Sequence, residues 1–114
     1  MDQKKLILRI KYKTDNEKLI INSLMYFVGE TAVFSANDLV RQKSTLMMAW
    51  LEGEALKTKN LYEPGGAFTI NKVLRKNEKD AMLIMTSDGA VVILSTKDPK
   101  GVEPQVTKIQ SAQK

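Results

Sequence analysis

The amino-acid sequence predicts an α+β fold in which an N-terminal strand precedes three helices, and a three-stranded antiparallel meander follows them. Three observations predict this order. Apolar and basic residues alternate over residues 5–13, apolar residues recur at helical spacing over residues 15–28 and 45–58, and two apolar runs flank an Asp-Gly pair further on. We expect one domain over residues 1–98. The segment 99–114 is polar and contains glycine and proline, so we expect a flexible tail there.

The first predicted element is a strand over residues 5–13. Its apolar residues recur at every second position, so they fall on one face of an extended chain, and its basic residues fall on the other. The basic face would be a ladder of charges about 7 Å apart. The first face contains Leu6, Leu8, Ile10 and Tyr12, and the second contains Arg9, Lys11 and Lys13.

A first helix is expected over residues 15–28. Thr14 can cap its free amides, while Glu17 reaches back from three positions further on, as in a capping box. Apolar residues then recur at helical spacing until Gly29, which is a natural helix end. The β-prone run Leu19-Ile20-Ile21 is the main observation against a helix in this segment.

A short strand is expected over residues 31–34, and two further helices over residues 36–42 and 45–58. Polar residues that can cap a helix precede both helical segments. Gly53 lies in the middle of the last helix, where it costs about 1 kcal/mol relative to alanine. A strand over residues 46–51 is therefore the competing interpretation.

The clearest break in the chain is Glu63-Pro64-Gly65-Gly66. Beyond it we expect a meander with strands over residues 67–74, 81–86 and 90–95. The last two strands are joined by Ser87-Asp88-Gly89, whose Asp-Gly pair is typical of a tight hairpin. Both strands are apolar at nearly every position. We therefore expect both faces of this hairpin to be covered, as in central strands or strands at a dimer interface.

The order of these elements resembles that of winged helix-turn-helix DNA-binding domains over residues 16–75. The resemblance implies that the helix beginning near Ser44 is a recognition helix, whose N-terminal end enters the DNA major groove. The matching pieces are Thr31-Ala32-Val33-Phe34-Ser35 leading into Asn37-Asp38-Leu39-Val40, and Trp50-Leu51 followed by Leu56 and Leu61-Tyr62.

The resemblance also implies two sets of DNA contacts. Hydroxyls and free amides at the start of the recognition helix suit phosphate oxygens, while Arg41 is suited to guanine and Gln42 to adenine. Basic residues further along the chain would make flanking and wing contacts. The first set is Arg41, Gln42, Lys43, Ser44 and Thr45, and the second set is Lys57, Lys59, Lys72, Arg75 and Lys76.

The composition favours a binding protein over an enzyme. The chain has no histidine and no cysteine, which removes the commonest general acid-base group, the commonest metal ligands and the thiol nucleophile. It carries 18 Lys and Arg against 13 Asp and Glu, a net charge of +5, and a basic surface attracts polyanions. We expect a non-enzymatic DNA-binding protein that favours duplex DNA, with no catalytic residue, metal or other cofactor.

Two other functions are consistent with the sequence. The basic segment and the meander suit a small oligonucleotide-binding β-barrel, which would bind single-stranded DNA through Arg9, Lys11, Tyr12 and Lys13. Alternatively, the apolar hairpin 81–95 is the association surface of a small adaptor or inhibitor, whose basic charge matches an acidic face of a protein partner. Homodimerisation would also cover this hairpin if it is exposed.

The apolar runs of the chain are short. Each of them, including Ala90–Leu94, is far below the roughly 20 residues that cross a bilayer, and the N-terminal residues do not form a secretory signal. Without cysteine there is no disulfide framework to indicate an oxidising compartment. We therefore expect a cytoplasmic protein with no membrane partner.

Overall fold

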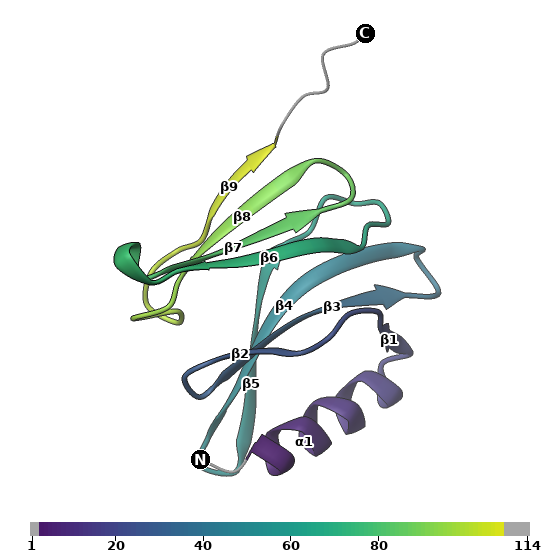
Figure 1. The fold of residues 1–114 in the computed structure, drawn as a ribbon. Helices are drawn as coiled ribbons and strands as arrows, with labels where there is room; N and C mark the ends of the chain where they lie inside the picture. The colour runs from purple at the N-terminus through teal and green to yellow at the C-terminus, as the bar shows by residue number, and fades with distance from the viewer. Residues whose placement is uncertain (1–2, 109–114) are drawn as a thin grey trace, which may run out of the picture. The chain divides into compact units, whose positions relative to one another are not determined.

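The computed structural model describes residues 3–108, which form one α-helix and two antiparallel sheets (Figure 1). The chain divides into two compact units, which we call unit 1 (Met1–Ala67) and unit 2 (Phe68–Lys114). The predicted fold of three helices followed by a meander is therefore wrong. The alternative, a small β fold, is closer, although among the described strands both sheets are open in their pairing order and form no closed barrel.

Unit 1 contains helix α1 (Gln3–Asn16) and a five-stranded antiparallel sheet. The strands follow the order β1-β3-β4-β5, and β2 also pairs with β3. Because β1 and β2 pair with opposite ends of β3, they share one edge of the sheet. The strands are β1 (Leu19–Ile21), β2 (Tyr26–Val28), β3 (Thr31–Asp38), β4 (Lys43–Glu52) and β5 (Ala55–Tyr62).

The segment predicted as a basic strand, residues 5–13, lies inside α1. The prediction failed because Leu6 and Ile10 are four residues apart. Side chains at this spacing share a face in a strand and also in a helix, so the pattern fits both structures. The segment is rich in leucine, lysine and arginine, which are good helix formers and favour the helix. Thr14, expected to cap a later helix, is buried near the end of α1, where its hydroxyl donates to the carbonyl of Lys11 at 3.1 Å.

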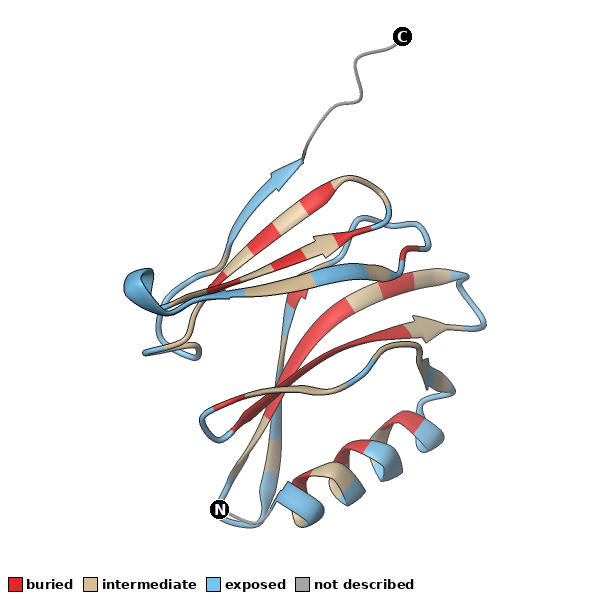
Figure 2. Cartoon of the chain, viewed as in Figure 1, coloured by how far each residue is buried: buried red, intermediate tan, exposed pale blue. Residues whose placement is uncertain are grey.

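Helix α1 packs on one face of the unit 1 sheet. Its buried positions recur along the helix, as Figure 2 shows, and Leu6 and Ile10 are 0% and 1% exposed. Three of their neighbours in the sheet are alanines, whose small side chains allow the helix to approach closely. This core cluster contains Leu6, Ile10, Ala32, Phe34, Ala36, Met47 and Ala49.

The helix predicted over residues 15–28 is wrong, because β1, a polar connection and β2 occupy this segment. The β-prone run Leu19-Ile20-Ile21 forms β1. In the connection, the N–H of Asn22 donates to the carbonyl of Ser35 at 3.0 Å, and the hydroxyl of Ser23 accepts the N–H of Ser35 at 2.9 Å. The edge of β3 thus stays hydrogen-bonded between β1 and β2.

The helices predicted over residues 36–42 and 45–58 are also wrong. The first is the end of β3 with the turn that follows it, and the second is the hairpin formed by β4 and β5. Gly53 lies in the turn of this hairpin at φ 62°, a conformation that glycine adopts without side-chain strain. The strand expected over residues 31–34 is confirmed as part of β3. The competing strand over residues 46–51 is also confirmed, as part of β4.

Unit 2 is a four-stranded antiparallel sheet in the order β6-β7-β8-β9. The strands predicted over residues 81–86 and 90–95 are confirmed, and the strand predicted over residues 67–74 is displaced toward the C-terminus. Gly89, at φ 91°, completes the turn of the predicted hairpin. The elements are β6 (Ile70–Lys76), a 3-10 helix (Asn77–Lys79), β7 (Ala81–Thr86), β8 (Ala90–Ser95) and β9 (Gln105–Lys108).

The segment expected to be a flexible tail, residues 99–114, contains β9, which pairs with β8. Residues 109–114 lie outside the described residues. The single domain expected over residues 1–98 stays a prediction. The chain forms two compact units, and whether they make up one domain depends on whether they unfold together.

Candidate functional site

The two faces of the unit 2 sheet differ in exposure. Alternate residues of a strand point to opposite faces. Along β7 and β8 buried and half-buried positions alternate at every residue, as Figure 2 shows. On the buried face Met82, Ile84, Val92 and Leu94 are each 0% exposed. We call the opposite, partly exposed face of this sheet the open face.

The open face is apolar in its middle. The pairing register arranges its residues in three rows that run across the strands. The five large apolar side chains in these rows are all half-buried, and the described part of unit 2 has no α-helix to cover them. The rows are Lys76-Ala81-Ser95, Leu74-Leu83-Ile93-Gln105 and Lys72-Met85-Val91-Thr107.

Lysines border the open face on the β6 side. Lys72 and Lys76 lie in its outer rows and are exposed, and Lys79 follows in the 3-10 helix. Among residues 3–108 none of these three lysines forms an ion pair. Glu78 is the acidic residue in this stretch. The opposite edge, formed by β9, contributes uncharged polar side chains, so positive charge is concentrated along one edge.

Two shallow hollows of about 240 and 260 Å³ lie at one end of the open face. They share Lys79, Ala81 and Ile93. The smaller one has an apolar floor beside lysine side chains, so it can accept an apolar side chain next to a carboxylate. Its lining is Lys76, Glu78, Lys79, Ala81, Leu83 and Ile93.

Sequence reasoning identified the hairpin 81–95 and missed the difference between its faces. Both strands are apolar at nearly every position, so the sequence of the hairpin contains no sign of which face is open. A sequence signal for the open face lies in β6, the strand next to the hairpin. Lys72, Leu74 and Lys76 alternate there, so the two lysines share a face with Leu74 and mark that face as the one in contact with solvent.

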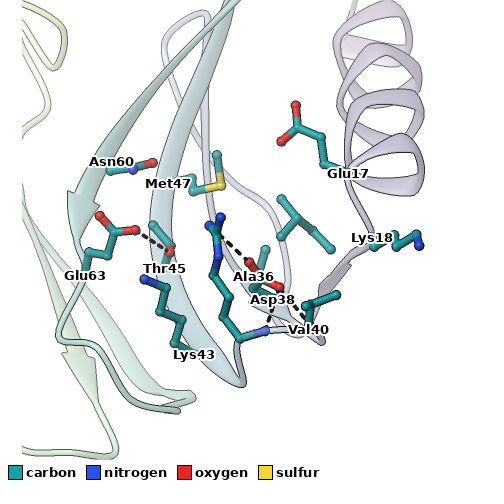
Figure 3. Close-up of a pocket in the computed structure, with 12 residues that line it drawn as sticks. Glu17, Lys18, Ala36, Asp38, Val40, Lys43, Thr45, Met47, Asn60 and Glu63 are labelled. Carbon is teal, nitrogen blue, oxygen red and sulfur yellow. Dashed lines mark hydrogen bonds and ion pairs between the residues drawn. The ribbon is translucent and has the colours of Figure 1, made fainter.

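Three of the residues expected to contact DNA, Arg41, Lys43 and Thr45, line a hollow of about 500 Å³ in unit 1 (Figure 3). The sheet is longer than the helix that packs on it: α1 has 14 residues and spans about 21 Å, whereas the 10 residues of β4 span about 33 Å. The hollow lies beside the C-terminal end of α1, with Ala36 and Met47 among its lining residues.

The charges around this unit 1 hollow are balanced. Arg41 lies 3.7 Å from Asp38, and the hydroxyl of Thr45 donates to Glu63 at 3.4 Å (Figure 3). In total the lining has three cationic side chains and three carboxylates, which are Lys18, Arg41, Lys43, Glu17, Asp38 and Glu63. The hollow is therefore not a purely cationic cradle for phosphates.

Gln42 and Ser44, the other residues expected at a helix start, have structural roles. Gln42 has φ 56° in the β3–β4 turn, and its N–H donates to the carbonyl of Asp38 at 2.8 Å. Ser44 is 0% exposed, and its hydroxyl donates to the side-chain oxygen of Asn37. Because Ser44 and Thr45 lie in β4, no recognition helix begins at this point.

The remaining expected DNA contacts lie on strands. Lys57 and Lys59 belong to β5 in unit 1, and the others belong to β6 in unit 2. Arg75 pairs across from Met82, so it points away from the open face that Lys72 and Lys76 border.

The residues of the alternative single-strand site lie on α1 and do not share one face. Arg9 donates to the carbonyl of Glu54, and Lys13 forms an ion pair with Glu17, just beyond the end of α1. Lys11 and Tyr12 point to solvent, and Tyr12 is 71% exposed. Two of the four expected residues, Arg9 and Lys13, are therefore already bonded to other side chains or backbone of unit 1.

Glu54 connects the turn between β4 and β5 to α1. Its carboxylate lies 2.7 Å from the ammonium of Lys5 and 3.8 Å from the guanidinium of Arg9. The hydrogen bond from Lys5, together with its charge, lowers the pKa of Glu54 below the ordinary value of 4.5, and the charge of Arg9 acts in the same direction. Two cations of the basic N-terminal segment are thus neutralised locally.

Comparison of the chain with protein-family models, curated proteins and solved structures found no match. Within residues 3–108, no helix has both the length and the apolar content needed to cross a bilayer. The same residues contain no group of three or more side chains suited to a metal ion.

Proposed function

We propose that the chain is a non-enzymatic protein-binding module, and that the open face of unit 2 binds its partner. The observation that carries this proposal is the apolar middle of a partly exposed sheet face, whose large side chains are half-buried. The solvent face of an antiparallel sheet is normally polar, and a contiguous apolar patch indicates a surface that another molecule covers. The patch consists of Leu74, Leu83, Met85, Val91 and Ile93.

The charges at the border of the face specify the chemistry of the partner. Lys72, Lys76 and Lys79 lie on one side of the apolar patch and lack ion-pair partners among the described residues. A complementary segment would place apolar side chains over Leu83 and Ile93, and carboxylates beside the lysines. Such charges contribute mainly to specificity and association rate, while the central apolar contacts contribute most of the affinity.

A protein partner agrees better with this surface than the DNA expected from the sequence. Single-strand sites stack bases on aromatic side chains, and the three rows of the open face contain no aromatic residue. The recognition helix that would read a duplex is replaced by strands. Several cations of unit 1 also have a carboxylate within 4 Å, which weakens their attraction for phosphate.

Selection from a library of random displayed peptides, with the full chain as bait, tests the proposal without a known partner. We expect enriched peptides that combine apolar residues with Asp or Glu. Leu83→Asp places a charge in the apolar centre and should weaken their binding about thirtyfold or more, since central contacts contribute about 2 kcal/mol or more. Lys72→Glu with Lys76→Glu should weaken it about tenfold and reduce its salt dependence.

Leu8→Asp is the matched control, because Leu8 is 66% exposed on α1 in the other unit. Peptides that bind Leu83→Asp and the unchanged chain equally well would contradict the proposal. A salt titration with single- and double-stranded oligonucleotides should find no binding. Tight, salt-dependent oligonucleotide binding that Leu83→Asp leaves unchanged would restore the nucleic-acid function. Dimerisation that Leu83→Asp abolishes would identify a second copy of the chain as the occupant.

A further inference from the structure

We propose that the β3–β4 turn of unit 1, residues 39–42, contacts the surface of a bilayer that contains anionic phospholipids. Two aliphatic residues follow each other in this turn and point to solvent, because Leu39 is 56% exposed and Val40 is 75% exposed. A turn between two strands is ordinarily polar. We call residues 39–42 the aliphatic tip. It joins the ends of β3 and β4 (Figure 1).

The aliphatic tip is held in one conformation by Asp38. The carboxylate of Asp38 accepts hydrogen bonds from the N–H groups of Val40 at 3.0 Å and Arg41 at 3.1 Å. Its carbonyl accepts the N–H of Gln42 at 2.8 Å. A tip fixed in this way keeps Leu39 and Val40 exposed, and it loses little conformational freedom when it binds.

Cationic side chains surround the tip. Because Leu19 of β1 pairs with Asp38, the preceding residue Lys18 lies close to the start of the turn. Arg41, whose side chain is 72% exposed, belongs to the tip itself, and Lys43 begins β4. Lys18 and Lys43 form no ion pair among residues 3–108.

The acidic side chains near the tip already have partners. Asp38 is bonded to the turn and to Arg41, and Glu17 is paired with Lys13. Glu63 accepts a hydrogen bond from a threonine. Two of the three acidic side chains are therefore paired with cations, and Glu63 keeps its charge, so among the described residues of this region the two unpaired lysines outnumber the one unpaired carboxylate.

Exposed aliphatic residues beside available cations fit a bilayer surface. A dissolved phosphate compound would account for the lysines alone and would leave Leu39 and Val40 unexplained. Peripheral binding combines insertion of apolar side chains with attraction to anionic headgroups, and neither contribution is sufficient by itself. The sequence-based expectation of no membrane partner rested on the lack of a spanning segment, which does not bear on surface contact.

Co-sedimentation of the full chain with lipid vesicles tests the inference. We expect binding to vesicles of phosphatidylcholine with phosphatidylserine and none to phosphatidylcholine alone. Lys18→Gln with Lys43→Gln should weaken binding about tenfold or more, since each basic group contributes about fivefold. Leu39→Ser with Val40→Ser should weaken it by a similar factor. Excess inorganic phosphate at constant ionic strength should not compete.

Two double variants of unit 1 are matched controls, and both should bind as the unchanged chain does. Lys11→Gln with Lys57→Gln removes the same charge from other exposed positions, and Leu8→Ser with Tyr12→Ser removes exposed apolar side chains from α1. The inference is overturned if the unchanged chain does not bind, if controls and tip variants lose binding equally, or if phosphate competes.

A fluorescent probe locates the contact independently of affinity. The chain has no cysteine, so Leu39→Cys provides a unique attachment site for an environment-sensitive dye. We expect its emission to shift to the blue with phosphatidylserine vesicles. The same dye at Leu24→Cys, a position 73% exposed outside the tip, should not shift. Equal shifts at both positions, or none at position 39 while the protein sediments, would place the contact elsewhere.

Discussion

The substitutions Ile10→Ala and Leu8→Ala separate the observed helix α1 from the strand that the sequence predicts over residues 5–13. In a strand these two side chains point to the same face, so their removal would have similar effects. In α1 they lie on different sides of the helix. Ile10 is 1% exposed in the core cluster, and Leu8 is 66% exposed.

The expected losses follow from burial. Ile10→Ala removes three carbon atoms from the core, a transfer loss of about 2.4 kcal/mol at about 0.8 kcal/mol each, and the remaining cavity raises the loss to about 3 kcal/mol. A typical domain is stable by about 5–15 kcal/mol, so this loss is large. Leu8→Ala removes little buried area, and alanine is a good helix former, so we expect a change within about 0.5 kcal/mol.

Urea unfolding of the full chain measures both variants. The fluorescence of Trp50 reports on unit 1, because this single tryptophan lies in β4, and far-ultraviolet circular dichroism reports on the whole chain. Equal losses for the two variants, or a larger loss for Leu8→Ala, would refute the packing of α1 on the sheet.

Three further predictions concern stability. Gly53→Ala should destabilise unit 1 by about 1–2 kcal/mol, because φ is 62° at Gly53 and alanine is strained there. Gly66→Ala is the control, because Gly66 has no positive φ, and it should change the stability of unit 1 by less than about 0.5 kcal/mol. The urea midpoints of the two variants measure this difference. Met82→Ala should lower the stability by about 2–5 kcal/mol, because Met82 is 0% exposed, and Met85→Ala should lower it clearly less because Met85 is half-buried. Thermal melts followed by circular dichroism that show equal losses of stability would contradict a buried face and an open face on this sheet. Glu54→Gln should lower the stability of the chain at neutral pH, because the ionised carboxylate of Glu54, whose pKa is lowered in the folded chain, stabilises the fold. This stabilisation is present above the ordinary pKa of 4.5 and is lost as the pH falls through the lowered pKa. Urea titrations of the unchanged chain and the variant should therefore converge in strong acid.

The sequence predicts unit 2 better than unit 1, because short sequence signals define the strands of unit 2. The Asp-Gly turn and two short apolar runs define the hairpin 81–95, and no helical pattern competes there. In unit 1 the patterns are ambiguous. Leu6 and Ile10 fit both periods, and the helical spacing over residues 45–58 spans a hairpin whose turn is at Gly53. In both cases the apolar spacing fits a helix and a strand, and residues outside that spacing decide the structure: the helix-forming residues of α1, and the turn at Gly53 that pairs β4 with β5.

The candidate site was predictable only in part. The sequence identifies the hairpin 81–95 as apolar and Lys72 and Lys76 as basic, yet it expects the hairpin to be covered on both faces and the lysines to contact DNA. The open face depends on the pairing register of β6 with β7, which places Lys72 beside Met85. That register comes from pairing between strands, so it could not be obtained from the order of residues.

Oxidation of Met82 and Met85 by dilute peroxide, followed by mass spectrometry, tests the central claim most directly. Both methionines belong to β7, and they point to the buried and the open face respectively. We expect Met85 to be oxidised several times faster than Met82, and a selected acidic peptide to protect Met85 alone. Equal oxidation rates, or a bound peptide that leaves Met85 unprotected, would contradict an open face that binds a partner.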